Sequence, residues 1–277
     1  MTIDFHTHVF PDSLAPRAVA NVAKIGGIPP HSDGTRAGLR ASMARNGIDA
    51  SVALQIATKP SQNRTVNEWA IQENSPDLVF FGSVHPGGAD WPDCVDRLAD
   101  AGVKGVKFHC DYQGFHVDDD KARPLYERLI ERGLVLVFHG GIDIGFPDNV
   151  HMTTDRVLRA YESTLRFGTV VLAHMGGWGL WDEVESDLVG SSLYFDTSYT
   201  AESLADDQFR RIVAKHGADR ILFASDSPWE DQALSLRRVR RIGFAPDVEA
   251  AILGGNAQRL LGIRPSPAAP STAQRRD

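Results

Sequence analysis

The sequence predicts a single (β/α)₈ barrel, in which eight parallel strands alternate with helices. A β-branched run, a polar or glycine-bearing loop and an amphipathic stretch repeat along the whole chain, which is the pattern of βα units. Eight such units in 277 residues match the usual size of this barrel, about 250 residues. A doubly wound open sheet is the alternative, but it normally carries a glycine-rich phosphate loop where this chain has HTHVFPD.

Eight runs of residues are the candidate strands: 2–9, 49–56, 78–85, 103–109, 134–139, 169–174, 192–197 and 220–226. Several of them, such as LVLVF before His139 and TVVLA before His174, are apolar without alternation. Parallel strands that are buried on both faces have this pattern. The runs therefore favour a barrel covered by helices.

The intervening stretches show helical periodicity. In residues 155–168, an apolar stripe of Val157, Leu158, Tyr161 and Leu165 follows Thr154, the expected N-cap. The last stretch, 264–277, has three prolines and almost no apolar content, so we expect a flexible tail behind a barrel domain of residues 1–263.

Composition excludes several classes of protein. The net charge of -7 argues against nucleic acid as a partner, since no basic run compensates for it. No apolar run approaches the roughly 20 residues that cross a bilayer, and residues 1–10 lack a signal-peptide core, so we expect a cytoplasmic protein without membrane contact. Cys94 and Cys110 are expected to be free thiols.

Six of the ten histidines close predicted strands: His6, His8, His85, His109, His139 and His174. In a (β/α)₈ barrel that end of the strands carries the active site. Any single histidine could instead be a hydrogen-bonded core residue. Their shared position favours a functional site over scattered core histidines.

His6 and His8 are two residues apart on one strand, so both rings point to the same face. Two neutral imidazoles on a rigid strand suit zinc or another divalent transition metal, and His139 can supply a third nitrogen. Asp226 ends a buried strand, where a carboxylate without a cation is costly. The alternative for Asp226 is a cap on the turn before Pro228.

Several motifs resemble the amidohydrolase superfamily, and more closely its amidohydrolase-related branch, which includes aminocarboxymuconate-semialdehyde decarboxylase and several lactone hydrolases. They are HTH on the first strand, VFHGG at His139, LAHMGG at His174, FDTS at 195–198 and SDSPW at 225–229. The closing GGNAQRLLG is similar to the branch's last helix, with Asn256 as its cap. The resemblance implies His6, His8, His139 and Asp226 as metal ligands and His174 as the catalytic histidine.

The function expected on these grounds is hydrolysis of a small ester, lactone or amide by a metal-activated water, with His174 and Asp226 moving protons. One divalent transition metal is expected: zinc, with Mn²⁺ or Fe²⁺ as alternatives. Nonoxidative decarboxylation of an aromatic or unsaturated carboxylic acid is the second hypothesis. A non-catalytic binding barrel is the third, although all five motif positions are intact.

This chain also departs from its relatives. The decarboxylase holds a substrate carboxylate with an arginine after the catalytic histidine, whereas no arginine stands between His174 and Ser191 here. Binuclear relatives carboxylate a lysine at the end of the fourth strand, where this chain has Lys107. Lys107 could instead anchor a substrate carboxylate or extend to water. A second metal therefore stays open.

Residues that follow the strands are expected to line the substrate pocket: Lys107, His109, Tyr112, Trp178, Tyr199 and Trp229. Their aromatic rings indicate a planar or apolar small-molecule substrate. His85 and Asp196 are expected to orient ligands from behind. The acidic run Asp182, Glu183, Glu185 and Asp187 would repel a second carboxylate if it faced the mouth. A homodimer is consistent with the family resemblance.

Overall fold

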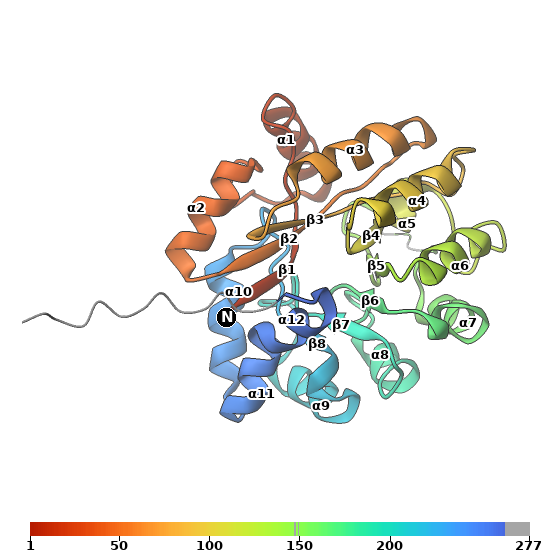
Figure 1. Cartoon of the computed structure of the whole chain (residues 1–277). Helices are drawn as coiled ribbons and strands as arrows, with labels where there is room; N and C mark the ends of the chain where they lie inside the picture. Colours follow the sequence, from red (N-terminus) through yellow and green to blue (C-terminus); the bar gives the residue numbers. More distant parts are fainter. Residues whose placement is uncertain (147, 149, 264–277) are drawn as a thin grey trace, which may run out of the picture.

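A computed structural model describes residues 1–146, 148 and 150–263 (Figure 1). Parallel strands follow one another in sequence order around a barrel: β1 Ile3–Thr7, β2 Ala50–Leu54, β3 Leu78–Phe81, β4 Gly105–Phe108, β5 Val135–Phe138, β6 Val170–Leu172, β7 Tyr194–Asp196 and β8 Ile221–Leu222. The predicted fold class is confirmed, with shorter strands than expected. The tail predicted for 264–277 lies outside the described residues.

The barrel is built from two sheets, β1-β2-β3 and β4-β5-β6-β7-β8. Isolated bridges rather than continuous ladders connect their edges, one of them between Thr7 and Ser227. At the same seam the backbone nitrogen of Asp226 donates to the carbonyl of His6 at 2.8 Å. This seam joins the first strand, β1, to the segment after the last strand, β8, and brings Asp226 beside His6.

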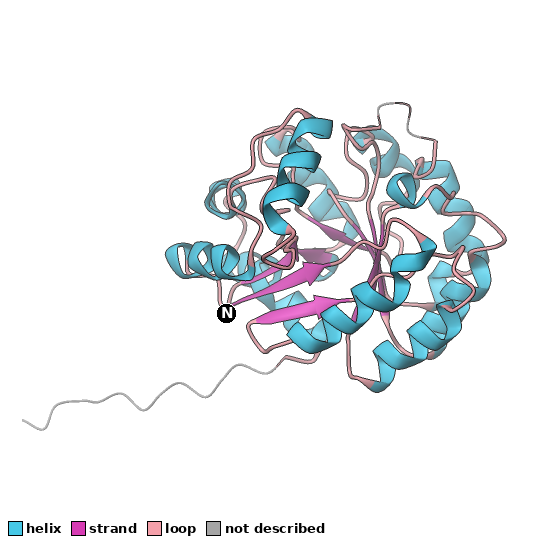
Figure 2. Ribbon diagram, turned by 90° about the horizontal axis from the view of Figure 1, so that it is seen from above, coloured by secondary structure: helices cyan, strands magenta, loops and turns pink. Residues whose placement is uncertain are grey.

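Helices lie around the outside of the strands and, at one end of the barrel, across its interior (Figures 1 and 2). They are α1 Ala15–Gly26, α2 Arg36–Asn46, α3 Asn63–Glu73, α4 Trp91–Asp100, α5 Cys110–Gln113, α6 Arg123–Glu131, α7 Thr154–Ser163, α8 Trp181–Asp187, α9 Asp206–His216, α10 Gln232–Ile242, α11 Pro246–Ala250 and α12 Asn256–Leu261, with short turns η1 Pro60–Gln62, η2 Leu165–Phe167 and η3 Ala218–Arg220 and the π-turn η4 Ala251–Gly255. Among the described helices, none has the length and apolarity needed to cross a bilayer.

Two of the expected helix caps are wrong. Thr153 rather than Thr154 precedes α7, although the predicted stripe is correct because Val157 is buried and Leu158 and Tyr161 pack against the core. Asn256 is the first residue of α12, and its side chain donates to two carbonyls near β8 instead of capping the helix. A buried amide at this place ties the last helix to the barrel.

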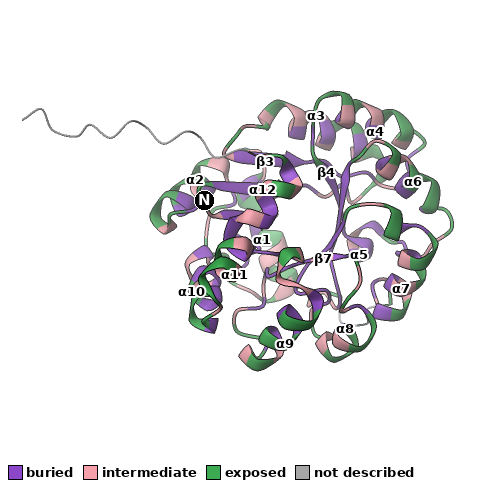
Figure 3. Ribbon diagram, turned by 60° about the horizontal axis from the view of Figure 1, so that its bottom comes forward, coloured by how far each residue is buried: buried purple, intermediate pink, exposed green. Residues whose placement is uncertain are grey.

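The apolar core has two parts, and the strands between them are buried on both faces (Figure 3). One part lies between strands and helices. The other fills the barrel with alternate strand residues such as Val52, Val137 and Leu222, and Ala257 and Leu261 of α12 pack onto it. Cys94 and Cys110 are buried free thiols, as predicted.

A bulge in β1 decides which side chains face the interior. Asp4 pairs with Ser51 but Thr7 pairs with Ala53, so β1 uses one residue more than β2 over this interval. Phe5 therefore packs in the barrel core, and the next residue, His6, also points inward. Strict alternation would have sent one of these two side chains outward.

Candidate metal centre and its cavity

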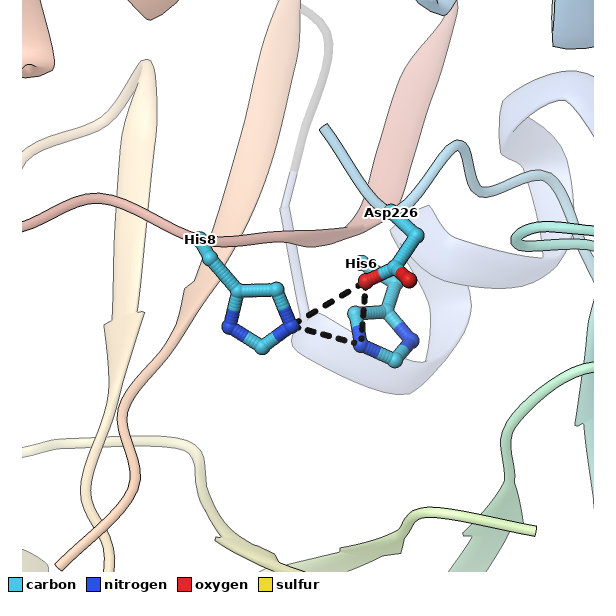
Figure 4. Close-up of side chains that lie close together, drawn as sticks. All are labelled: His6, His8 and Asp226. Carbon is cyan, nitrogen blue, oxygen red and sulfur yellow. Dashed lines mark hydrogen bonds and ion pairs between the residues drawn. The ribbon is translucent and has the colours of Figure 1, made fainter. Parts of the chain in front are cut away.

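Three predicted ligands meet at the carboxyl ends of β1 and β8 (Figure 4). The Nε2 atoms of His6 and His8 are 3.2 Å apart. Asp226 Oδ1 lies 3.3 Å from His6 Nε2 and 3.1 Å from His8 Nε2. All three side chains are largely buried, so the group is shielded from bulk water.

Hydrogen bonds assign the protons on both rings. His6 Nδ1 donates to the Asp196 carboxylate at 2.9 Å, and His8 Nδ1 donates to the Leu54 carbonyl at 2.9 Å. Burial lowers the pKa of His6 well below its ordinary value, so this ring is neutral. His6 Nε2 then carries a lone pair, which faces the Asp226 carboxylate and His8 Nε2.

A divalent metal fits this arrangement. Tetrahedral coordination at about 2.0 to 2.1 Å places neighbouring ligand atoms about 3.3 Å apart. The three observed separations lie between 3.1 and 3.3 Å. Facing acceptors without a cation would repel one another, which makes a metal the simplest partner for the group.

Lys107 of β4 supplies the nearest positive charge. Its Nζ lies 3.3 Å from His6 Nε2. The side chain is fully buried, so the alternative that it extends to water is wrong. Burial lowers the pKa of Lys107 to about 8, which leaves the amine largely protonated at neutral pH.

His139, the fourth predicted ligand, follows β5 and lies against His174. Its Nδ1 is 3.1 Å from His174 Nε2, while His174 Nδ1 donates to the Ser198 carbonyl at 3.0 Å. His139 Nδ1 is therefore the donor, and His139 Nε2 keeps a buried lone pair without a hydrogen-bond partner in the described part of the chain. His109, His139 and Asp143 form a second group of possible ligands.

The backbone at the site is strained. His174, Met175, Tyr199 and Asp226 have positive φ angles of 60°, 55°, 51° and 72°, a conformation uncommon for residues other than glycine. Three of these four were predicted as site residues. Such strain persists where surrounding structure imposes it and is concentrated at functional sites. At His174 this conformation comes two residues after the end of β6.

Asp196 of β7 holds the site together from behind, as the sequence predicted. One carboxylate oxygen accepts from His6 Nδ1 at 2.9 Å, and the other accepts from the backbone nitrogens of His174 and Ser198 at 3.1 and 3.0 Å. This fully buried carboxylate fixes the His6 ring so that Nε2 faces the metal centre.

One cavity of about 420 Å³ opens onto the metal centre. All predicted substrate-binding residues line it: Lys107, His109, Tyr112, Trp178, Tyr199 and Trp229, together with His6, His8, His139, His174 and Asp226. The cavity gathers side chains from around the barrel, as the strand-end rule predicts.

One sequence expectation about this end of the barrel fails. His85 does not line the cavity, and its Nδ1 instead accepts from the backbone nitrogen of Gly87 at 3.0 Å. The acidic run of α8 does not line the cavity, so the condition under which it would repel a second carboxylate is not met, and Glu185 pairs with Arg211 and Lys215. Asp143 was not predicted from the sequence, where its only signal is its place in the loop after His139.

The comparisons with known proteins agree with this architecture. A family model described as "Amidohydrolase" matches residues 3–263. No curated protein matches the chain.

Solved structures share the fold at low sequence identity. The 5-carboxyvanillate decarboxylase of Sphingomonas paucimobilis is 17% identical, covers 95% of this chain and 99% of its own, and has a TM-score of 0.71. A dihydroxybenzoic acid decarboxylase of Polaromonas sp. JS666, with bound manganese and 2-nitroresorcinol, is 16% identical, with coverages of 96% and 98% and a TM-score of 0.71. A candidate 2-pyrone-4,6-dicarboxylic acid hydrolase of Pseudomonas putida is 19% identical, with coverages of 96% and 98% and a TM-score of 0.67.

Proposed function

The chain belongs to the amidohydrolase family, and on this premise we propose that it is a metal-dependent hydrolase of a small ester, lactone or amide. The observation that carries the proposal is the convergence of His6 Nε2, His8 Nε2 and Asp226 Oδ1 within 3.3 Å of one another in a substrate-sized cavity. We assign His139 as the fourth ligand because its buried Nε2 is unpaired among the described residues.

A divalent metal bound there would act as a Lewis acid and lower the pKa of a coordinated water towards 7. Imidazole and carboxylate ligands suit zinc, which we propose as the native metal, and they also accept manganese or iron(II). This set of donors, with one carboxylate and three imidazoles, leaves the bound ion with net positive charge.

His174 is the proposed proton acceptor. The Ser198 carbonyl holds its Nδ1 proton, so the proton accepted in the reaction goes to Nε2, which must first exchange its hydrogen bond from His139 Nδ1 for one from the water or substrate. Asp226 is the proposed proton shuttle: its carboxylate oxygen that does not face the histidines takes one proton from the attacking water and passes it to the leaving oxygen or nitrogen. Both residues stand at strand ends in imposed backbone conformations, which keeps the proton-transfer groups in place.

Nonoxidative decarboxylation is the second candidate. The aromatic lining of the cavity favours it, and decarboxylases of aromatic acids occur among the proteins that share this fold. Here His174 or Asp226 would protonate the carbon that loses its carboxylate. Hydrolysis is preferred because no arginine is among the described residues that line the cavity, where it could hold a carboxylate for this reaction.

Incubation of the metal-loaded protein in ¹⁸O-water with lactones, amides and aromatic acids distinguishes these functions. Hydrolysis puts one ¹⁸O into the acid product, and the His174→Asn variant should abolish this incorporation. Release of carbon dioxide with solvent deuterium in the ring, and no ¹⁸O in any product, would replace the hydrolase by the decarboxylase. We also propose a cytoplasmic location for this activity.

A further inference from the structure

The charges of the cavity are unevenly distributed. Among its described lining residues, Lys107 is the sole lysine or arginine, and it lies at the floor beside His6. The wall instead carries the carboxylate of Asp143, which accepts from His109 Nε2 at 3.0 Å and from the backbone nitrogen of Gly145 at 2.7 Å. An anionic group of a substrate is therefore attracted at the floor and finds no cation along the wall.

Apolar side chains form most of the cavity above the floor. We call this part the upper cavity, and three segments supply its walls: α1 and the loop after it, α3, and the loop after β5, with side chains of Val22, Ile28, Val66, Trp69, Ile142 and Ile144. Of the polar residues between them, Gln62 and Thr65 carry no charge, and Asp143 is the carboxylate of the wall described above.

The walls of the upper cavity touch one another. A Cβ atom added to Gly26 of α1 would lie 3.2 Å from Ile144 Cδ1, so the helix and the loop after β5 are in van der Waals contact. A ligand body in the upper cavity is thus surrounded by apolar groups on more than one side. Removing such a surface from water is favourable for an apolar body and unfavourable for a charged one.

We propose that the substrate carries one polar reacting group on an apolar body, with at most one negative charge. The reacting group lies at the floor near Lys107 and the metal ligands, and an aryl or branched alkyl body fills the upper cavity. A second carboxylate on that body weakens binding of the substrate. This inference rests on the proposed function for the position of the reacting group, but it concerns binding rather than reaction type.

Binding of unreactive acids to the zinc-loaded protein tests the proposal without catalysis. The three probes are acetate, 2-naphthoate and naphthalene-2,6-dicarboxylate, measured by isothermal titration calorimetry. We expect 2-naphthoate to bind at least about tenfold more tightly than either of the others, because it alone matches both the floor and the upper cavity. Equal or tighter binding of the dicarboxylate would overturn the proposal.

A charge added to the wall should reverse this preference. Val66→Arg places a guanidinium on the α3 wall, and we expect the dicarboxylate to gain at least about tenfold in affinity relative to 2-naphthoate. The control is Gln72→Arg, which adds the same charge to an exposed position of α3 outside the cavity. Val22→Lys makes the same test from α1, so the proposal stays falsifiable if one variant does not fold.

If a folded Val66→Arg or Val22→Lys protein keeps the wild-type ratio of dicarboxylate to 2-naphthoate affinity, the assignment of these residues to the cavity wall is wrong.

The binding test and the test of the proposed function can fail independently. If naphthoate preference holds while ¹⁸O incorporation fails, the substrate class stands and the hydrolase is wrong. If hydrolysis occurs but dicarboxylates bind as well as monocarboxylates, the substrate class is wrong.

Discussion

Replacing Asp196 by asparagine should weaken metal binding. Asp196 is not itself a proposed ligand, because it contacts His6 at Nδ1 and the metal would bind at Nε2. In the protein, one oxygen of this carboxylate accepts from His6 Nδ1 at 2.9 Å and the other accepts from two backbone nitrogens. An asparagine that keeps the backbone bonds must point its NH₂ group at His6. His6 Nδ1 then becomes an acceptor, and the ring proton moves to Nε2, where the metal would bind.

The expected magnitude follows from this loss of orientation. Removing a carboxylate that orients a histidine ligand typically costs 10- to 100-fold in metal affinity, which is about 1.4 to 2.7 kcal/mol. If the amide flips instead, Asp196→Asn keeps the His6 bond but leaves buried backbone nitrogens facing a donor, so the protein becomes less stable. Both outcomes depend on the full burial of Asp196, because water cannot replace the lost hydrogen bonds there.

Competition between the protein and a chelator for Zn²⁺ at pH 7 measures the effect, with circular dichroism as the check on folding. Asp207→Asn is the matched control, because this aspartate lies on α9 with its side chain 87% exposed. A folded Asp196→Asn protein that shows wild-type zinc affinity and wild-type stability would refute the reasoning.

Three further predictions concern the site and its surroundings. His174→Asn should keep the metal but lower kcat at least about 100-fold, as expected for one proton-transfer group; metal loss in elemental analysis would make His174 a ligand instead. His139→Ala should lower zinc affinity in the chelator titration, whereas His31→Ala should not, and equal affinities would remove His139 from the ligand set. Burial raises the pKa of Glu230 to about 7, so between pH 4.5 and 7 the native state holds a proton that the unfolded chain releases. The free energy of unfolding should therefore fall by about 3 kcal/mol across this range, and urea titrations of Glu230→Gln should lack that fall.

The sequence predicted the fold and the residues around the cavity because both depend on local pattern. Continuous apolar runs marked strands buried on both faces, and six of the eight runs ended in a polar residue. Since the barrel brings all strand ends to one face, His6, His139 and Asp226 could be placed at one site without knowledge of any contact.

The relative placement of these residues could not be predicted in the same way. The bulge in β1 arises from pairing with β2 and lets Phe5 and His6 both face the interior, contrary to simple alternation. The positive φ of His174 also depends on residues distant in sequence, because its backbone nitrogen donates to Asp196 and its ring to the Ser198 carbonyl. His85 closes a predicted strand like the others, but backbone hydrogen bonding turns it to Gly87. These effects involve long-range contacts or local backbone geometry that periodicity does not encode.

Anomalous scattering from crystals of the protein grown with Mn²⁺ tests the central claim most directly. The account predicts one strong peak within bonding distance of His6 Nε2, His8 Nε2, Asp226 Oδ1 and His139 Nε2. A map without a peak there, or with its peak between His109, His139 and Asp143, would contradict the proposed metal centre and the mechanism that depends on it.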